Sequence, residues 1–378
     1  MGWDDLTGQA DAIAIMRDAA EDEAGLTHSW LLTGPPGSGR SILAYAFAAA
    51  LIARPGDEEA TEAQVQARTH PDLGILSTDR VTITIDEVRQ LVASSQYSPS
   101  VGRYRVMVIE DADRMTERTS NVLLKALEEP PPRTVWILCA PSEADLIPTI
   151  RSRVRSVRLR VPAIDEVAEL ISRRDGVSLP EAITAAREAQ SHIGMAHRLA
   201  TNDKARERRR RTLELALGIR SVSGAVLAAA ELVAVAGEDA KAYTEENDAE
   251  ERDKALRSLG IEPGGAVPPG LRAQLKALDD DQKRRATRSL RDGIDRILVD
   301  LMSLYRDILL LQLGVATEPV NLAIYAQLEQ AAAQATPSRT LETLDAIATA
   351  RERIEGNVAP ALALEAMLVS AVRERSSR

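Results

Sequence analysis

A glycine-rich segment near the start of the chain constrains the fold more than any other feature. Residues 31–41 read LLTGPPGSGRS, which matches the phosphate-binding pattern G-x-x-x-x-G-K-[ST] except that Arg40 stands in the lysine position. Such a loop follows a buried strand and opens a helix, because its backbone N–H groups and the helix N-terminus together face a phosphate. The candidate nucleotide-binding residues are Gly34, Gly37, Ser38, Gly39, Arg40 and Ser41.

The segments around this loop alternate as expected for an α/β domain. Short apolar runs predict buried strands, and longer stretches between them predict helices. The predicted strands cover 28–33, 72–76, 105–110 and 134–140, and the predicted helices cover 8–21, 39–53, 85–96 and 117–129. This alternation predicts a mostly parallel sheet with helices on both faces.

After Pro162 the strand signal disappears, and the rest of the chain reads as helical. We predict an α/β P-loop domain over 1–160, a small helical lid over 161–205 and an all-α domain over 206–378. Within the last domain, 237–292 contains an acidic stretch and a stretch rich in glycine and proline. We interpret it as an insertion or elaboration.

Composition excludes several classes of protein. A net charge of −10 argues against strong autonomous binding to nucleic acid. The single cysteine, Cys139, excludes an internal disulfide framework, and its apolar strand predicts a packing role rather than a reactive thiol. The apolar runs are too short or too interrupted to span a bilayer, and the N-terminus has no signal-peptide pattern. We therefore expect a cytoplasmic protein.

Two carboxylates follow the third predicted strand, where P-loop ATPases of this type place first a metal-binding Asp and then a water-orienting Glu. Here the order is exchanged, with Glu110 before Asp111. A displacement of about 1 Å can cost on the order of 100-fold in rate, and the fork of Arg40 does not replace a lysine ammonium. Weak or absent hydrolysis is therefore predicted. Alternatively, Glu110, Asp111 and Asp113 only form a solvated strand end.

Several segments, taken together, resemble the AAA+ clamp-loader family. They follow the family order over residues 3–160, whereas beyond 205 only the helical architecture is similar. The segments are DDLTGQ (4–9), HSWLLTGPPGSGRS (28–41), THPDL (69–73), ITIDEVRQLV (83–92), GRYRVMVIEDADRMTERTSNVLLKALEEPPP (102–132) and PTIRSR (148–153).

The resemblance implies a role in a hetero-pentamer that opens a ring-shaped sliding clamp with ATP and closes it on primed DNA. The implied partners are the gamma/tau and delta subunits of such a loader, with the clamp and the DNA reached through the complex. The implied ligand of the loop is ATP or ADP with Mg²⁺. The C-terminal helices would form the collar that holds the subunits together.

The resemblance also implies an arginine that acts on a neighbouring subunit. The family motif Ser-Arg-Cys reads Ser152-Arg153-Val154 here, so the arginine is kept and the cysteine is lost. Arg153 is therefore the candidate arginine finger in trans. In the alternative interpretation, the arginines of this segment line the solvated face of a strand; they are Arg151, Arg153, Arg155, Arg158 and Arg160.

This sequence departs from the family pattern at two further places. Relatives commonly carry a zinc-binding cysteine cluster before the HPD segment, but 51–72 contains no cysteine, and His70 alone cannot build a tetrahedral site. We therefore predict no zinc. The sensor arginine of the lid falls in GMAHRLA, where His197 and Arg198 are both candidates.

Two functional hypotheses remain, and a third is weaker. The first is a stator subunit that supplies Arg153 in trans and hydrolyses little or no nucleotide itself. The second is a catalytically active clamp-loader ATPase of the gamma/tau type, with Arg40 tolerated. A stand-alone AAA+ remodelling enzyme fits less well, because the matching segments are typical of loaders.

Overall fold

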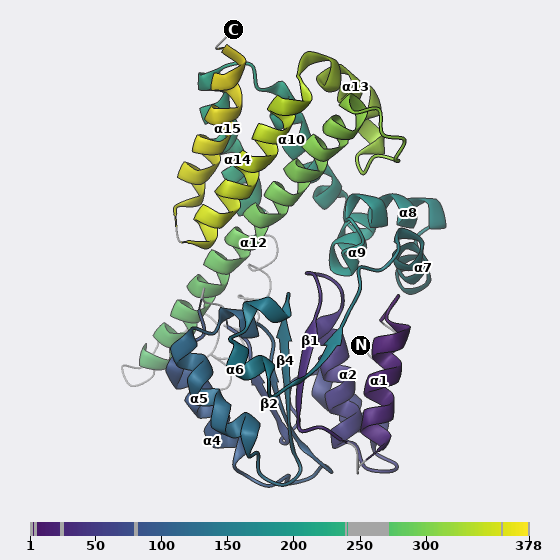
Figure 1. The fold of residues 1–378 in the computed structure, drawn as a ribbon, viewed down its shortest axis with the longest axis vertical. Coiled ribbons are helices and arrows are strands. Elements are labelled where there is room, and N and C mark those ends of the chain that lie inside the picture. Colours follow the sequence, from purple (N-terminus) through teal and green to yellow (C-terminus); the bar gives the residue numbers. More distant parts are fainter. Residues whose placement is uncertain are drawn as a thin grey trace. The chain divides into compact units, whose positions relative to one another are not determined.

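The chain is divided into two units, Met1–Thr201 and Asn202–Arg378. The computed structural model describes residues 3, 6–22, 26–78, 82–238, 240, 272–356 and 358–376. The first unit contains a parallel sheet and the glycine-rich loop, and the second contains only helices within its described residues (Figure 1). The predicted order of an α/β region followed by helices is confirmed. The finer predicted boundaries at 160/161 and 205/206 stay a prediction.

Five parallel strands form the sheet, in the order β2-β3-β4-β1-β5. In β1, which lies between β4 and β5, Leu31 lies opposite Leu138 of β4 and Ser156 of β5. All four predicted strands are confirmed, and β5 adds a fifth, on which Arg155 and Arg158 are exposed. The strands are β1 (Ser29–Thr33), β2 (Leu73–Leu76), β3 (Arg105–Ile109), β4 (Thr134–Ala140) and β5 (Arg155–Arg158).

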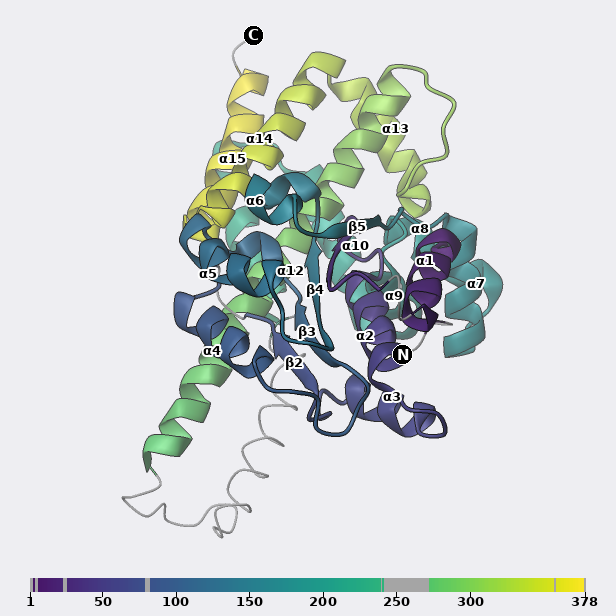
Figure 2. The ribbon, with the colours of Figure 1, turned by 60° about the horizontal axis from the view of Figure 1, so that its bottom comes forward.

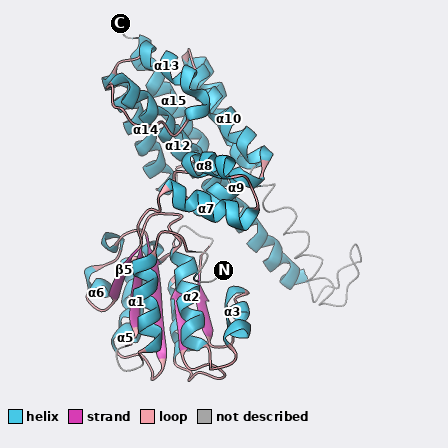
Figure 3. Cartoon of the chain, turned by 90° about the vertical axis from the view of Figure 1, so that its right-hand side faces the viewer, coloured by secondary structure: helices cyan, strands magenta, loops and turns pink. Residues whose placement is uncertain are grey.

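Helices cover both faces of this sheet (Figures 2 and 3). Alternate residues of β1 point to opposite faces, so Trp30 packs with Phe47 of α2 while Leu31 packs with Leu123 of α5. The four predicted helices are confirmed, whereas the short helix α3 was not predicted. The helices are α1 (Ala10–Glu21), α2 (Arg40–Ile52), α3 (Glu58–Gln66), α4 (Ile85–Ser95), α5 (Glu117–Glu128) and α6 (Pro148–Arg151).

Local signals explain where several of these helices begin and end. Thr84 caps α4 by accepting a hydrogen bond from the Glu87 amide, and the Glu87 side chain accepts one from the Thr84 amide in return. Thr116 caps α5 through the Thr119 amide. The same helix ends just before Pro130, because a residue that precedes proline is disfavoured in helical geometry.

Three short helices complete the first unit, as predicted for the lid region. They are α7 (Ile164–Asp175), α8 (Leu179–Glu188) and α9 (Ile193–Thr201). Gly176 ends α7 with φ +70°, which only glycine adopts without steric cost. Ser178 then caps α8 by accepting a hydrogen bond from the Glu181 amide.

The second unit is a helical bundle around a buried aliphatic core. Leu232, Leu301, Leu328 and Leu364 are fully buried in that core. Of the segment 237–292, residues 239 and 241–271 lie outside the described residues, and 272–292 are continuous with one long helix. Besides a helix over 222–238, the unit contains α10 (Asp203–Gly218), α12 (Arg272–Gln312), α13 (Tyr325–Gln334), α14 (Pro337–Glu355) and α15 (Pro360–Ser376).

Candidate nucleotide-binding site

The glycine-rich loop connects β1 to α2, as its pattern predicts. Gly37 and Gly39 have φ values of +79° and +94°, in the left-handed region that favours glycine. A Cβ atom would also have no room at either position, because it would collide with the His192 ring at Gly37 and lie 2.7 Å from Cδ2 of Leu6 at Gly39. The loop therefore has the conformation that directs backbone N–H groups toward an anion.

Arg40 is the first residue of α2. Its Nη1 atom is buried and has no hydrogen-bond partner within the described part of the chain. Burial raises the pKa of the nearby Asp113 carboxyl, while the positive charge of Arg40 acts in the opposite direction. A buried guanidinium nitrogen without a partner at the start of this helix is suited to an anionic oxygen.

The strand-end carboxylates are held by residues other than Arg40. Glu110 Oε1 accepts hydrogen bonds from the Tyr45 hydroxyl and from Arg68 Nη2, the latter at 2.7 Å. Asp111 lies in the following turn, with a carboxylate oxygen 3.9 Å from Nε of Arg114. Glu110 and Asp111 are therefore near each other in the chain but are held by different partners.

Tyr45 and Arg68 were not predicted as site residues. Tyr45 lies one helical turn after Ser41, so both project from the same face of α2. Arg68 follows α3 with φ +58°, and its guanidinium carbon lies 5.3 Å from the centre of the Tyr45 ring. Burial, followed by the charge of Glu110, raises the pKa of Tyr45, so its hydroxyl remains a donor. No local sequence signal connects these three residues.

Arg153 lies in the turn between α6 and β5, with a third of its side chain exposed. Its Nε donates to Glu128 Oε1 at 2.6 Å, and its Nη2 also contacts this oxygen. Its Nη1 donates to the Thr149 carbonyl at 2.7 Å and to Ser152 Oγ at 3.0 Å. The guanidinium thus has a defined orientation at the surface of the first unit. Arg153 precedes β5, so the solvated-strand alternative does not describe it.

The N-terminal segment connects the loop with the start of the lid. Gln9 is buried, and its Nε2 donates to the Ser38 carbonyl at 3.2 Å and to the Arg160 carbonyl at 2.8 Å. The Arg160 amide donates back to Gln9 Oε1 at 3.1 Å. The side chain of Arg160 in turn forms a two-point ion pair with Glu166 of α7. One glutamine therefore contacts both the loop and the segment that leads into the lid.

The candidate sensor residues lie on α9. His197 Nδ1 is 2.7 Å from Asp175 Oδ2, so this side chain is engaged within the lid. His192, just before α9, accepts a hydrogen bond from the Met195 amide at Nδ1 and places its ring against Gly37. The lid residue that touches the loop is therefore His192, whereas a sensor role for His197 or Arg198 stays a prediction.

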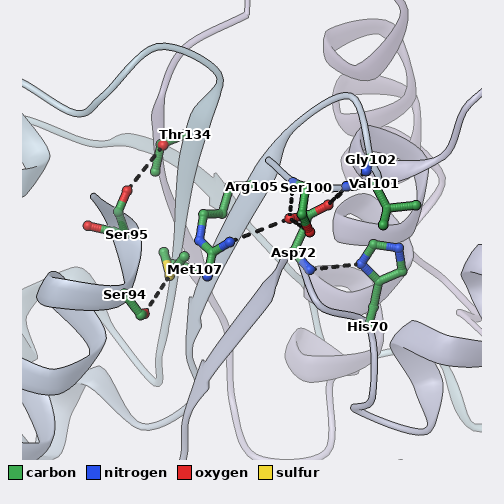
Figure 4. Close-up of polar contacts among 10 residues, drawn as sticks. All are labelled: His70, Asp72, Ser94, Ser95, Ser100, Val101, Gly102, Arg105, Met107 and Thr134. Carbon is green, nitrogen blue, oxygen red and sulfur yellow. Dashed lines mark hydrogen bonds and ion pairs between the residues drawn. The ribbon is translucent and has the colours of Figure 1, made fainter. Parts of the chain in front are cut away.

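The HPD segment has a structural role, because its aspartate holds the segment around Ser100 through hydrogen bonds (Figure 4). Asp72 is fully buried and accepts hydrogen bonds from the amides of Ser100, Val101 and Gly102 at 2.6, 2.7 and 2.7 Å. His70 is also buried, and its Nδ1 accepts from the Asp72 amide at 3.1 Å. Burial lowers the pKa of His70, so its neutral ring acts as the acceptor.

The remaining predictions concern Cys139, metal binding and membrane insertion. Cys139 is fully buried in β4, and burial raises its pKa to about 12. In the part of the chain that the structure describes, no group of three or more His, Cys, Asp or Glu side chains is arranged to hold a metal ion. The prediction of no zinc remains untested by this finding. Among the described helices, none has the length and apolar character needed to cross a bilayer.

Comparison with known proteins finds relatives of the first unit. Residues 8–163 match the family described as DNA polymerase III, delta subunit. The delta' subunit of Pseudomonas aeruginosa is 34% identical over 155 residues, which cover 39% of this chain and 47% of that protein. The delta' subunit of Haemophilus influenzae is 35% identical over 122 residues, covering 32% and 37%.

A second type of relative matches the same region. The tau/gamma subunit of DNA polymerase III from Haemophilus influenzae is 31% identical over 170 residues, covering 43% of this chain and 24% of that protein. The chain spans less than half the length of each of these relatives. The unit that carries the glycine-rich loop is thus similar to delta' and tau/gamma subunits of DNA polymerase III.

Proposed function

We propose that the chain is a delta-prime-type subunit of the DNA polymerase III clamp loader. It would assemble with gamma/tau and delta subunits into a hetero-pentamer that loads the sliding clamp onto primed DNA. The family match over 8–163 and the delta' relatives support this assignment. The helical second unit would serve as the collar through which the subunits associate.

The observation that carries this proposal is the presentation of Arg153. A finger that acts in trans must lie at the surface, and its guanidinium must be oriented before the neighbour binds. Arg153 is partly exposed, and Glu128 and the Thr149 carbonyl hold it from two sides. Both interactions are at the surface, so they exchange readily for a phosphate oxygen of the neighbouring site.

The chain's own loop would bind ATP or ADP but hydrolyse it weakly or not at all. Arg40 replaces the lysine that normally contacts the β- and γ-phosphates, and an arginine fork does not reproduce the position of a compact ammonium. Glu110, in the position of the metal-binding carboxylate, is already bound by Tyr45 and Arg68. The subunit would therefore act as a stator that supports a neighbour's reaction.

An active ATPase of the gamma/tau type is the second candidate, favoured by the match to the tau/gamma relative over 170 residues. Steady-state ATPase measurements on the isolated chain separate the two candidates. The stator proposal predicts negligible turnover, while turnover typical of P-loop ATPases, on the order of 1 s⁻¹ or faster, would support the alternative.

The role of Arg153 is tested in the loader reconstituted with its clamp and primed DNA. Arginine fingers contribute roughly 10³ to 10⁵ in rate at a single site. Because the loader has several ATPase sites, we expect Arg153→Ala to lower clamp-stimulated ATPase by a smaller factor, without loss of assembly on size-exclusion chromatography. Arg151→Ala, an exposed arginine two residues earlier, is the matched control. Equal activity of the two variants would remove the trans role.

A further inference from the structure

Glu110 is the carboxylate that directly follows β3. In P-loop enzymes, the divalent cation is held by the Ser or Thr of the loop and by an acidic residue that follows a neighbouring strand. In this chain those positions are occupied by Ser41 and Glu110. A bound Mg²⁺ therefore requires the Glu110 carboxylate to be available, because this cation tolerates little departure from octahedral oxygen coordination.

Glu110 is held by two donors that come from different elements. The Tyr45 hydroxyl reaches it from α2, and Arg68 reaches it from the segment after α3. Both donate to the same oxygen, Oε1, and the Glu110 side chain is only 16% exposed. The Arg68 guanidinium also lies over the Tyr45 ring, so the two donors support each other.

The two donors differ in strength. Arg68 is half exposed, so its ion pair with Glu110 contributes little by itself. Tyr45 is partly buried and its hydroxyl donates to a carboxylate oxygen of Glu110, and the loss of such a hydrogen bond changes an equilibrium by about tenfold or more. The two donors occupy one oxygen of the carboxylate and offset its negative charge, which weakens Glu110 as a ligand for a cation, and Tyr45 contributes more to this effect than Arg68.

The neighbouring carboxylate does not replace Glu110 in this role. Asp111 lies beyond the strand in the next turn and faces Arg114. Asp113 is mostly buried, and burial raises its pKa, which weakens it as an anionic ligand. The carboxylates present are therefore weaker ligands for a P-loop magnesium ion than carboxylates without such donors would be.

The anion-binding half of the site is intact by contrast. The loop has the glycine conformations of a phosphate cradle, and a buried Arg40 nitrogen has no hydrogen-bond partner among the described residues. An arginine fork can bind two phosphate oxygens at once. It thereby supplies positive charge where a lysine and a metal ion would otherwise share the task.

We propose that this loop binds the phosphates of a nucleotide without a divalent cation, using Arg40 and the backbone amides, because Tyr45 and Arg68 offset the charge that Glu110 would offer to a metal. This inference rests on the proposed nucleotide binding of the loop. It also accounts for a stator that holds nucleotide without turning it over.

The test is isothermal titration of the full-length chain with ATP, and separately with inorganic tripolyphosphate, in excess Mg²⁺ and in EDTA. We expect the two conditions to give Kd values that differ by less than about tenfold for each probe. Tightening by Mg²⁺ of about tenfold or more would overturn the inference. Arg40→Ala should abolish binding in both conditions, and unchanged binding by this variant would overturn it as well.

A second set of variants tests whether Tyr45 and Arg68 weaken metal binding at Glu110. Tyr45→Phe keeps the ring packing and removes only the hydroxyl, and combined with Arg68→Ala it leaves Glu110 without either donor. We expect this double variant to bind ATP about tenfold more tightly with Mg²⁺ than with EDTA. Arg89→Ala, an exposed arginine paired with Asp86 on α4, is the control. If Mg²⁺ changes the ATP affinity of the double variant no more than that of the control, the proposed effect of Tyr45 and Arg68 on metal binding is refuted.

The outcomes also separate this inference from the trans role of Arg153. If neither probe binds in either condition, the inference fails, while the loader ATPase of Arg153→Ala still decides the stator role. If both probes bind equally with and without Mg²⁺ but Arg153→Ala does not lower the ATPase of the loader, the inference stands and the stator role fails.

Discussion

Replacing Asp72 by alanine is expected to lower the free energy of unfolding of the first unit by about 3–5 kcal/mol. Asp72 is fully buried, and its two carboxylate oxygens receive the amides of Ser100, Val101 and Gly102. The Ser100 hydroxyl donates a further hydrogen bond at 2.9 Å. These contacts hold the segment that leads into β3, the strand that ends at Glu110.

The magnitude follows from the groups that would be left without partners. A buried N–H that loses its acceptor costs about 1–3 kcal/mol; the Gly102 hydrogen bond is buried and those of Ser100 and Val101 are partly buried, so the three together are expected to cost about 3 kcal/mol. Water that enters the vacated space recovers part of the larger sum, which keeps the expected loss near the lower end. Asp72→Asn keeps the volume but turns an N–H₂ group toward these donors, so it should restore little of the stability.

Tryptophan fluorescence during urea unfolding is the appropriate assay. The three tryptophans of the chain are Trp3, Trp30 and Trp136, so the signal reports only the first unit. The control is Asp86→Ala, whose exposed pair with Arg89 at 3.3 Å should contribute less than about 1 kcal/mol. A loss for Asp72→Ala no larger than that of the control would refute the reasoning.

The hydrogen bonds to Asp72 also predict that the stability of the first unit depends on pH. Burial alone would raise the pKa of Asp72, but hydrogen bonds from Gly102, Ser100 and Val101 hold it below its ordinary value. A group with a lowered folded-state pKa stabilises the protein above its unfolded pKa, about 4 for Asp, and this stability is lost as the pH falls toward the folded-state value. The stability difference between wild type and Asp72→Asn should therefore shrink below about pH 4. A difference that is constant down to about pH 3 would contradict this sign.

Three further predictions concern other parts of the chain. A double-mutant cycle on Glu128→Gln and Arg153→Ala should give a coupling energy of less than about 1 kcal/mol in urea unfolding, because both partners are partly exposed; a larger value would mean that the pair is structural. In the second unit, Asp307→Ala should cost about 3 kcal/mol by circular dichroism, since buried Asp307 accepts hydrogen bonds from the amide and side chain of Asn321 at 2.8 Å each; a neutral result would show that this network is replaceable. Cys139 should react with a thiol reagent only on unfolding, because burial raises its pKa to about 12, and fast labelling of the native chain would contradict its position in β4.

Much of the fold could be predicted because its signals are local. The glycine pattern at 34–39 specifies a strand before it and a helix after it, and apolar runs mark β3 and β4. Two elements were not predicted for identifiable reasons. The helix α3 has few buried residues, and β5 is a short strand of mostly exposed residues, so neither shows a clear apolar pattern.

The candidate site residues could be predicted only where they belong to a motif. The loop residues and Arg153 could be selected from their motifs, but their partners could not. Glu128 lies 25 residues before Arg153, and Arg68 lies 42 residues before Glu110. Such pairs have no spacing rule, since they depend on which segments the parallel sheet brings to one edge.

The sequence by itself determined that the chain builds a phosphate loop on a parallel sheet, because glycine conformations and strand and helix periodicity are properties of neighbouring residues. Only the tertiary structure decided that Glu110 faces Tyr45 and Arg68, while a buried nitrogen of Arg40 has no hydrogen-bond partner among the described residues. The reason is physical: a buried charge takes the nearest donors that the fold supplies, and those donors come from segments that are distant along the chain.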